Sequence, residues 1–249
     1  MVTSIKTKAQ SDRSTLTRAR ILQAALHEFS THGFAGARTS RIAQAARVNK
    51  ALLYYYFDSK EKLYAAAIEM IADKVFERTM SVYQHKATAG ERLMRTALDH
   101  FDRMLTQWEF QSIMQQEMMR HHKGEPGALP LIVERFFAPL QSVYRKVVQE
   151  GIASGELIDV DWMQIQLAAI GANVFYFLSA PVYRMVMPFE PLEAKTLATR
   201  RKALVEYIGQ AIFQDRSHGA TLAARVLADT PMPDIKHNRL LSRRDHERA

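Results

Sequence analysis

The sequence predicts an all-α protein in which a small N-terminal domain of three helices precedes a larger helical domain. Apolar residues recur at helical spacing, and no stretch alternates apolar and polar residues as a half-buried strand does. Between residues 38 and 57, two short helical segments are separated by a turn of three to four residues, which is the arrangement of a helix-turn-helix. Positive charge is concentrated in this first part of the chain.

The composition limits the class of protein. A chain of 249 residues can bury a core without disulfides or a structural metal. It has no cysteine, which excludes thiol catalysis, disulfides and cysteine-ligated zinc. The opening segment MVTSIKTKAQSDRSTLTRAR lacks the apolar region of a secretory signal. We therefore expect a cytoplasmic protein.

The net charge of +8 is unevenly distributed. Residues 1–62 hold eleven Lys or Arg and four Asp or Glu, whereas residues 63–215 hold sixteen and eighteen. Residues 216–249 hold seven and four. A basic N-terminal quarter on a nearly neutral body indicates an anionic partner for that quarter. The simpler alternative, a solvated charged surface, is usually spread more evenly.

The first helix is expected over about residues 14–32, because Leu22, Ala25 and Phe29 share one face and Gly33 suits a helix end. Residues 1–13 are expected to form a flexible basic extension. Two readings of the positive charges here have equal weight: contact with a DNA groove or backbone, or non-specific attraction by a disordered tail. The residues concerned are Lys6, Lys8, Arg13, Arg18 and Arg20.

Cap residues place the next helices. Thr39 or Ser40 is expected to cap a short helix, and Asn49, after a turn at Arg47–Asn49, to cap a second. Ser59 or Asp58 then caps a longer helix that runs to about Tyr83. The predicted domain covers residues 14–62, with the motif at 38–57.

Four aromatic rings lie together in NKALLYYYFDSKEKL. On a helical wheel, Leu53 and Phe57 face the core and Tyr56 its margin. Lys50, Tyr54 and Tyr55 face outward. Phenol groups flanked by lysines suit a phosphate backbone, since the phenol donates a hydrogen bond and the ammonium neutralises charge.

The segment TSRIAQAARVNKALLYYYFDSKEKL resembles the DNA-binding signature of the TetR family of bacterial transcriptional regulators. The resemblance covers about residues 14–70. Two positions depart from the family pattern: Arg47 replaces a turn glycine, at a strain of about 1 kcal/mol, and Asn49 replaces serine. The matching positions are Thr39, Ile42, Ala43, Ala46, Val48, Leu53, Tyr54, Phe57, Ser59, Lys60, Glu61 and Leu63.

The resemblance implies roles for individual residues. Thr39, Tyr54, Tyr55 and Lys60 would grip phosphates, while Lys50, Ala51 and Leu52 would approach base edges, Leu52 by contact with a thymine methyl. The partner would be double-stranded DNA with a pseudo-palindromic operator. The full candidate set for DNA binding is Thr39, Arg47, Asn49, Lys50, Ala51, Leu52, Tyr54, Tyr55 and Lys60.

The second domain is expected over residues 63–215, with a largely disordered extension over 216–249 that holds one weak helix near 218–228. It is predicted to bind an effector and to dimerise. Its helices are expected at about 90–106, 108–122, 128–153, 160–180 and 191–214.

The resemblance implies a homodimer built on the last two long helices. Small residues in the first of them allow close helix packing, and it is too apolar for a monomer surface; a monomeric core is the alternative. Residues 162–183 carry no formal charge but include three amides, so a membrane span is rejected. The predicted interface residues are Ala168, Ala172, Leu197, Leu204 and Ile208.

The family usually encloses a small-molecule effector in this domain. Met and aromatic residues at helical spacing are more often ordinary core, which is the alternative here. Arg103, Arg120 and Arg145 are candidates to anchor an acidic effector, or are surface charges. The candidate lining is Met94, Phe101, Met104, Trp108, Met114, Met118, Phe137, Tyr144 and Phe175.

Three other functions are set against a ligand-released repressor. A DNA-binding protein controlled by a protein partner, or one that organises DNA, keeps the motif without an effector. An enzyme is not expected, because no nucleophile elbow, phosphate loop or HExxH motif occurs. No metal or cofactor is expected either, since His121 and His122 diverge by about 100° on a helix that also carries Glu117.

Overall fold

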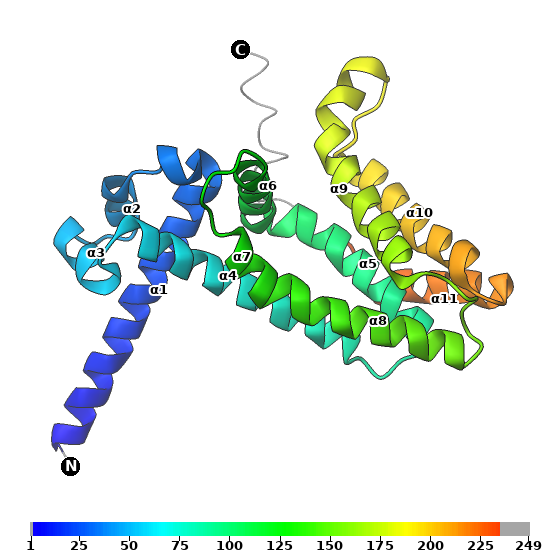
Figure 1. Ribbon diagram of the computed structural model, residues 1–249, viewed down its shortest axis with the longest axis horizontal. Helices are drawn as coiled ribbons and strands as arrows, with labels where there is room; N and C mark the ends of the chain where they lie inside the picture. Colours follow the sequence, from blue (N-terminus) through cyan, green and yellow to red (C-terminus); the bar gives the residue numbers. More distant parts are fainter. Residues whose placement is uncertain (1, 235–249) are drawn as a thin grey trace. The chain divides into compact units, whose positions relative to one another are not determined.

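The computed structural model describes the backbone of residues 2–234 and the side chains of residues 12–234. The elements in this part of the chain are all helices, and the one β-type contact is an isolated bridge between Leu157 and Phe213 (Figure 1). This confirms the all-α prediction. The elements are α1 (Val2–Gly36), α2 (Thr39–Ala45), α3 (Lys50–Phe57), α4 (Lys60–Tyr83), α5 (Ala89–Thr106), α6 (Trp108–His122), α7 (Leu129–Ile132), the π-helix η1 (Val133–Phe137), α8 (Ala138–Ala153), α9 (Trp162–Val186), α10 (Ala194–Ile212) and α11 (Arg216–Asp229).

The chain forms two compact units that do not follow the predicted boundary at residue 62. The first contains the chain up to Phe76 together with Glu109–Ala138, and the second contains Glu77–Trp108 and the chain from Pro139 onwards. The helices after the helix-turn-helix therefore do not all belong to one domain, because α6, α7 and η1 pack with the N-terminal helices.

The first unit is built around the buried face of α1. Ile21 and Phe29 are fully buried there, beside Leu53 and Phe57 of α3, which confirms the predicted inner faces. Gly33 interrupts the helix at φ 69°, as expected for its end. The backbone of residues 2–13 continues α1, so the predicted flexible extension is instead helical.

Hydrogen bonds explain why α6 belongs to the first unit. Ser112 Oγ and Gln116 Nε2 both donate to the carbonyl of Ser30 at the end of α1, at 2.7 and 3.0 Å. Tyr64 of α4 donates to the fully buried Glu117 at 2.7 Å. Since an unsatisfied buried charge is costly, these contacts hold α6 against α1 and α4.

The predicted helix over 128–153 is divided in the structure. A short α7 passes into η1, where the amide of Ala138 donates to the carbonyl of Val133. Pro139 follows, and its ring nitrogen has no hydrogen to donate to the preceding turn. We attribute the wider turn to this missing donor, since π-type turns occur where the regular pattern is interrupted.

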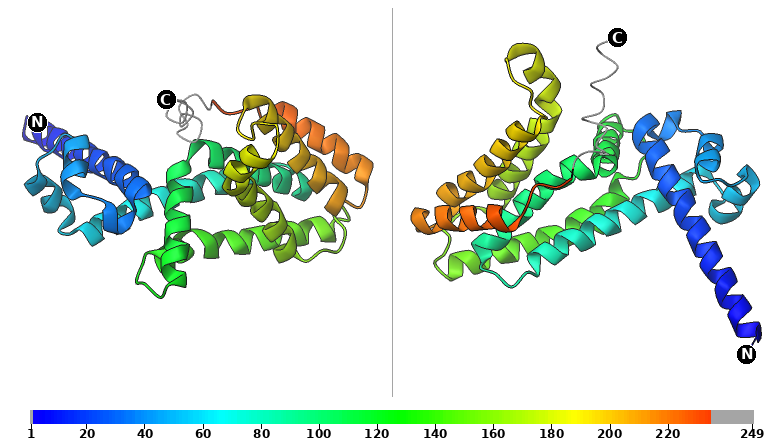
Figure 2. Two further views of the ribbon diagram at one scale, coloured as in Figure 1. Left: turned by 90° about the horizontal axis from the view of Figure 1, so that it is seen from above. Right: turned by 180° about the vertical axis from the view of Figure 1, so that it is seen from behind.

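The second unit is centred on α5, which packs against α9, α10 and α11 (Figure 2). Arg201 of α10 makes two hydrogen bonds of 2.8 Å to Asp102 of α5, and both side chains are almost fully buried. The pair neutralises two charges inside the unit and fixes α10 on α5.

Residues 216–229 form α11, which confirms the weak helix predicted near 218–228 and extends it at its start. Gly209 of α10 and Gly219 of α11 lie so close that a carbon added to Gly219 would be 2.3 Å from the Gly209 carbonyl oxygen. The two backbones meet only because neither residue has a side chain. Residues 235–249 of the predicted extension lie outside the described residues.

Candidate nucleic-acid interface

The turn before α3 has the geometry that the sequence indicated. Arg47 adopts φ 54°, the left-handed region in which glycine is favoured. Asn49 then accepts a 2.7 Å hydrogen bond from the amide of Leu52 through its side chain, which confirms it as the cap of α3. The turn and the cap together set the start of α3.

Thr39 has a different role from the predicted cap. Arg38 occupies the cap position of α2 without a side-chain bond, and Thr39 is the first helical residue. The Thr39 hydroxyl lies 3.3 Å from the Tyr54 hydroxyl. Tyr54 is consequently half-buried and tied to α2 rather than fully outward.

The outward face of α3 carries Lys50, Ala51 and Tyr55. All three are exposed, and Tyr55 is 80% exposed. The Lys50 ammonium lies 5.9 Å from the centre of the Tyr54 ring. Leu52 is half-buried at the edge of this face. The helix thus presents an ammonium, a methyl and a phenol to solvent on a rigid backbone.

Two contacts from α1 support the rear of α3. Tyr56 lies 3.1 Å from the Ser14 hydroxyl, and the Arg18 guanidinium lies 5.3 Å from the centre of the Phe57 ring. Tyr56 is half-buried, as the helical wheel predicts for the margin of the core. Arg18 accordingly covers an aromatic ring in the structure.

Lys60 lies in the first turn of α4, which Ser59 caps by accepting from the amide of Lys62. Its ammonium is 4.9 Å from the centre of the Phe34 ring and 3.4 Å from the Ala35 carbonyl. It is half-buried, so a phosphate contact requires Lys60 to leave or share these partners.

Sequence reasoning missed Glu28. This buried residue of α1 accepts a 3.0 Å hydrogen bond from the amide of Arg38 and lies 3.7 Å from the Arg41 guanidinium. It therefore positions the start of α2. No sequence pattern distinguishes it from an ordinary charged helix residue, since only the fold brings it to the next helix.

The nine candidate effector residues are divided between the two units. Met114, Met118 and Phe137 belong to the first unit and the other six to the second. Met118 and Phe175 are 51% and 61% exposed. Met94, Phe101, Met104 and Tyr144 are buried, and Trp108 is half-buried.

Two of the three candidate anchors for an acidic effector are already paired. Arg103 is buried and binds Asp99 and, at 2.8 Å, the Thr79 hydroxyl. Arg120 lies 2.7 Å from Glu117. A carboxylate ligand would have to displace a buried acid from either one.

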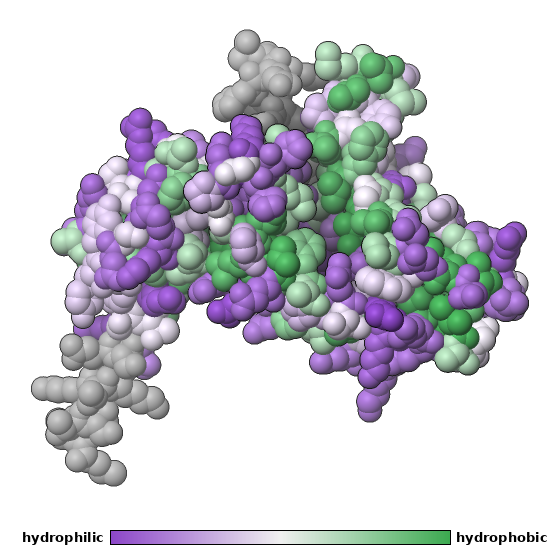
Figure 3. All heavy atoms as spheres, viewed as in Figure 1, coloured by the Kyte–Doolittle hydropathy of each residue, from purple (hydrophilic) through white to green (hydrophobic). Residues whose placement is uncertain are grey.

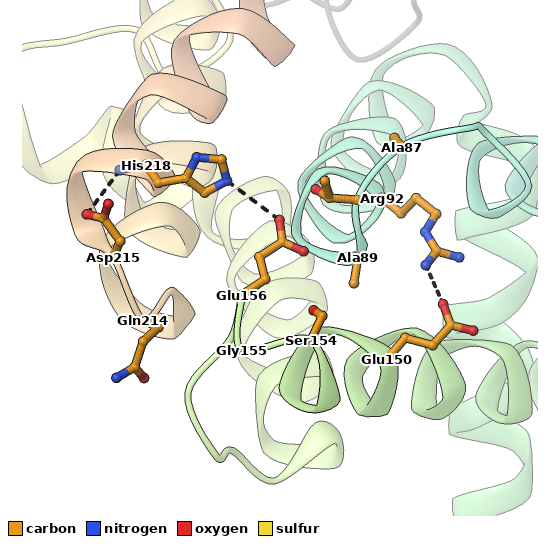
Figure 4. Close-up of a pocket in the computed structure, with 11 residues that line it drawn as sticks. Ala87, Ala89, Arg92, Glu150, Ser154, Gly155, Glu156, Gln214, Asp215 and His218 are labelled. Carbon is orange, nitrogen blue, oxygen red and sulfur yellow. Dashed lines mark hydrogen bonds and ion pairs between the residues drawn. The ribbon is translucent and has the colours of Figure 1, made fainter.

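The second unit has an open pocket of about 670 Å³ between the start of α5, the end of α8 and the start of α11 (Figure 4). Arg92 pairs with Glu150 across it, and Glu156 accepts from the amide of Gly90 at 3.0 Å. His218 lies 3.8 Å from Glu156. None of the nine candidates lines this pocket, whose charged groups are engaged with one another.

The outer face of α9 is strongly apolar (Figure 3). Ala168 and Ala172 are exposed on it, as predicted for an interface, whereas Leu197, Leu204 and Ile208 of α10 are buried within their own unit. Predicting those three as interface residues was wrong, because α10 turns them toward α5 and α11. The large exposed residues of α9 are Met163, Leu167, Phe175, Leu178, Val182, Met185 and Val186.

By length and composition, α9 is the one helix among the described residues that could cross a bilayer, and 17% of its most apolar window is buried. It is capped by Asp161, which accepts from the amide of Met163 at 2.8 Å. Among the described residues, no group of three or more His, Cys, Asp or Glu side chains is arranged to hold a metal ion.

Comparison with known proteins agrees with this interface. Residues 21–79 match the family described as bacterial regulatory proteins, tetR family. The chain is 53% identical over 53 residues to the HTH-type transcriptional repressor SCO4008 of Streptomyces coelicolor, which covers 21% of this chain and 28% of that protein. It is 28% identical over 150 residues to the HTH-type transcriptional repressor NicS of Pseudomonas putida, covering 60% and 70%.

Solved structures show the same fold over most of the chain. FadR from Bacillus subtilis, in complex with stearoyl-CoA, has a TM-score of 0.59 at 19% identity and covers 76% of this chain and 96% of that one. At this identity the similarity concerns the fold alone. With the helix-turn-helix geometry and the match over residues 21–79, this part of the chain is similar to the tetR family of bacterial regulatory proteins. Its relatives are transcriptional regulators and not enzymes.

Proposed function

We propose that the protein is a dimeric, sequence-specific transcriptional repressor of the cytoplasm, released from its operator by a small-molecule effector. The outward face of α3 is the observation that carries the DNA-binding part of the proposal. Lys50, Ala51 and Tyr55 are exposed on a helix fixed by the Asn49 cap and by the Thr39–Tyr54 contact. A helix held in this way can enter a major groove and present Lys50 to base edges.

The flanking groups suit the phosphate backbone. Tyr55 carries an exposed hydroxyl, and Lys60 lies in the first turn of α4, whose free amides also favour an anion. Arg47 adds an exposed positive charge beside α3. The similar proteins SCO4008 and NicS are repressors, which favours repression as the direction of control.

The exposed face of α9 supports the dimer. It combines bulky residues such as Leu167 and Phe175 with the small residues Ala168, Gly171 and Ala172, and a side chain added at Gly171 would meet nothing within 4 Å. A second copy of α9 would cover this face and bring two recognition helices to one DNA duplex. Tyr207 of α10 is also exposed.

An effector acts only if it binds the DNA-binding and the released conformations with different affinity. Contacts such as Gln116 to Ser30 join α6 to the end of α1 within the first unit. A shift of α6 would therefore reach the helix-turn-helix through direct hydrogen bonds. That FadR was solved with stearoyl-CoA supports a small-molecule ligand for a protein of this fold.

The alternative is a DNA-binding protein controlled by a protein partner, or one that organises DNA. The pocket of the second unit favours it, because this pocket is open and its charged groups are paired with one another. This alternative requires no response to any metabolite.

Selection of bound duplexes from random DNA tests the proposal. We expect enrichment of an inverted repeat with half-sites about 34–36 Å apart along the duplex.

Lys50→Ala should change the preferred base pairs, whereas Tyr54→Phe and Lys60→Ala should weaken binding to every sequence. Lys60→Ala should also lower the slope of log affinity against log salt concentration by about one. Lys62→Ala is the matched control, because Lys62 is exposed and pairs with Asp58 at 2.7 Å. Salt-sensitive binding with no enriched sequence would contradict sequence-specific repression.

A further inference from the structure

The N-terminal half of α1, up to Arg20, is a largely exposed helix. Its backbone is helical from Val2, and Figures 1 and 2 show it projecting beyond α2 and α3. Of the described side chains before Ile21, Thr17 is half-buried and the others are exposed, whereas Ile21 is fully buried. A mostly polar helix without a packed face is marginal in water, because helices depend on packing for most of their stability. A partner along this part of α1 would therefore stabilise it.

Three of the five positive charges in this half of α1 fall on one side of the helix. Lys6, Arg13 and Arg20 are seven residues apart, so at about 100° per residue their positions lie within about 40° of one another. Gln10 and Thr17 lie between them on the same side, so this side carries no acidic residue from Lys6 to Arg20. We call Lys6, Arg13 and Arg20 the basic stripe.

The described part of the chain does not neutralise the stripe. No described acidic residue forms an ion pair with Arg13 or Arg20, and both side chains are exposed. Asp12, the one acidic residue between residues 2 and 20, is about 100° from Arg13 and so lies off the stripe. Among the described residues, the arginines of this unit that form ion pairs are Arg41, Arg120 and Arg135. The stripe consequently offers its positive charge to another molecule.

Contacts with α3 fix the basic stripe beside the proposed DNA-reading helix. The hydroxyl of Ser14, which follows Arg13, lies 3.1 Å from the Tyr56 hydroxyl, and the Arg18 guanidinium lies 5.3 Å from the centre of the Phe57 ring. Successive charged positions of the stripe are about 10 Å apart along the helix axis. That distance is close to three base-pair steps of DNA, in which each strand carries one phosphate about every 3.4 Å along the axis. The spacing suits a regular row of anions.

We propose that the basic stripe binds the phosphate backbone of the same DNA duplex that α3 reads, with one phosphate at each of Lys6, Arg13 and Arg20. Such contacts orient a protein on the duplex and raise its affinity without reading the bases. Duplex DNA fits better than an acidic protein, because the stripe is attached to a helix-turn-helix and its charges repeat at a multiple of the phosphate spacing. This inference rests on the DNA-binding part of the proposed function and adds a second surface to it.

An exchange of neighbouring residues tests the position of the charge. Ala19→Arg combined with Arg20→Ala keeps the composition and the net charge but moves one positive charge about 100° round the helix, off the stripe. Both positions are exposed. In this variant and in Arg20→Ala, the slope of log affinity against log salt concentration should fall by about 0.9, with about five-fold weaker binding at about 0.15 M salt. Fluorescence anisotropy of the full-length protein on a labelled duplex measures both quantities.

A wild-type slope in the exchange variant would overturn the inference, since a flexible basic tail responds to total charge and not to its position. A second exchange, Asp12→Arg with Arg13→Asp, should lower the slope further, because it also places a carboxylate on the stripe. Arg135→Ala, which removes an exposed arginine of the same unit, is the matched control and should leave the slope unchanged. The free energy of unfolding in urea should match wild type for both exchanges, because all four positions are exposed.

A selected and a random duplex together distinguish failure of this inference from failure of the proposed function. Selection of an inverted repeat, with equal slopes for wild type and the Ala19–Arg20 exchange, keeps the proposed repressor and overturns the stripe. No selected sequence, with a lower slope for the exchange on random duplex, supports the stripe and contradicts the repressor. Selection with the exchange protein should return the wild-type consensus, because phosphate contacts carry no base information. A changed consensus would show that the stripe reads bases instead.

Discussion

At the residue scale, the turn before α3 stores backbone strain at an exposed position beside the proposed DNA-binding face. Arg47 has φ 54°, a conformation that costs a residue with a side chain about 1 kcal/mol or more. Its side chain is exposed and charged. Retention of an arginine where glycine is easier is explained if the charge contributes to DNA binding.

Two uncharged substitutions at Arg47 test the backbone strain of the turn. Arg47→Gly should leave the free energy of unfolding within about 1 kcal/mol of wild type, because relief of strain offsets the greater entropy of the unfolded chain. Arg47→Val should lower it by about 1 kcal/mol or more, since a β-branched residue is strongly disfavoured at positive φ. Urea unfolding measures both. Equal stability of the two variants would show that the turn is not strained.

His100 gives the folded state a defined response to acid. Burial, and secondarily the nearby Arg103 guanidinium, lowers its pKa to about 3, below the unfolded value of about 6.5. Between these values the unfolded chain binds the proton and the folded protein does not, so stability falls as the pH is lowered. The slope from this one group is at most about 1.4 kcal/mol per pH unit, and above pH 6.5 it contributes none.

The contribution of His100 to the pH dependence of stability is measured by comparing wild type with a variant that lacks the imidazole. Urea unfolding of wild type and His100→Gln should give free energies whose pH dependence differs by one proton between about pH 3 and 6.5, with wild type losing stability faster toward acid. The difference should be constant above pH 7. Parallel curves across the acid range would contradict the buried, neutral state of His100.

At the element scale, α11 is attached to α10 through a backbone contact rather than through an apolar seam alone. Gly209 and Gly219 meet at distances that exclude any side chain. The buried Leu222 and Val226 of α11 then pack in the same unit. The helix was predicted only weakly because its sequence is short and polar, and the close approach of two glycines depends on tertiary structure.

Gly219→Ala tests this contact. Alanine normally favours a helix over glycine by about 1 kcal/mol. Here the new carbon would lie 2.3 Å from the Gly209 carbonyl oxygen, so we expect a loss of about 1–3 kcal/mol instead. Thermal or urea unfolding measures it. Gly36→Ala, whose new carbon would lie at an ordinary 3.5 Å from His32, is the control. A stabilised Gly219→Ala protein would show that the helices are further apart.

At the scale of the whole molecule, the proposed function depends on two copies of the chain. The apolar outer face of α9 is too extensive for a solvated helix, and a second copy is the partner that a pseudo-palindromic operator requires. The small residues at its centre would allow the two helices to approach closely.

Charge placed on this face should separate the copies. Leu167→Glu and Phe175→Glu together should weaken dimerisation at least about 100-fold, because each copy would bury unpaired carboxylates that also repel one another. Analytical ultracentrifugation measures the association. Met118→Glu, which adds the same charge at a residue that is 51% exposed on α6, should leave it unchanged. A variant that remains fully dimeric would place the interface elsewhere.

The sequence by itself determined the helical class, the helix-turn-helix with its Asn49 cap, and the core positions Leu53 and Phe57. These follow from local signals: periodicity, cap residues and the wheel of a short helix. Tertiary structure alone decided which faces meet. An apolar seam such as that of Leu197, Leu204 and Ile208 is equally suited to a core and to an interface. Only the packing of α10 on α5 and α11 shows that these three residues belong to the core. The pairing of His100 with Asn173 joins residues far apart in the chain, so no local pattern contains it.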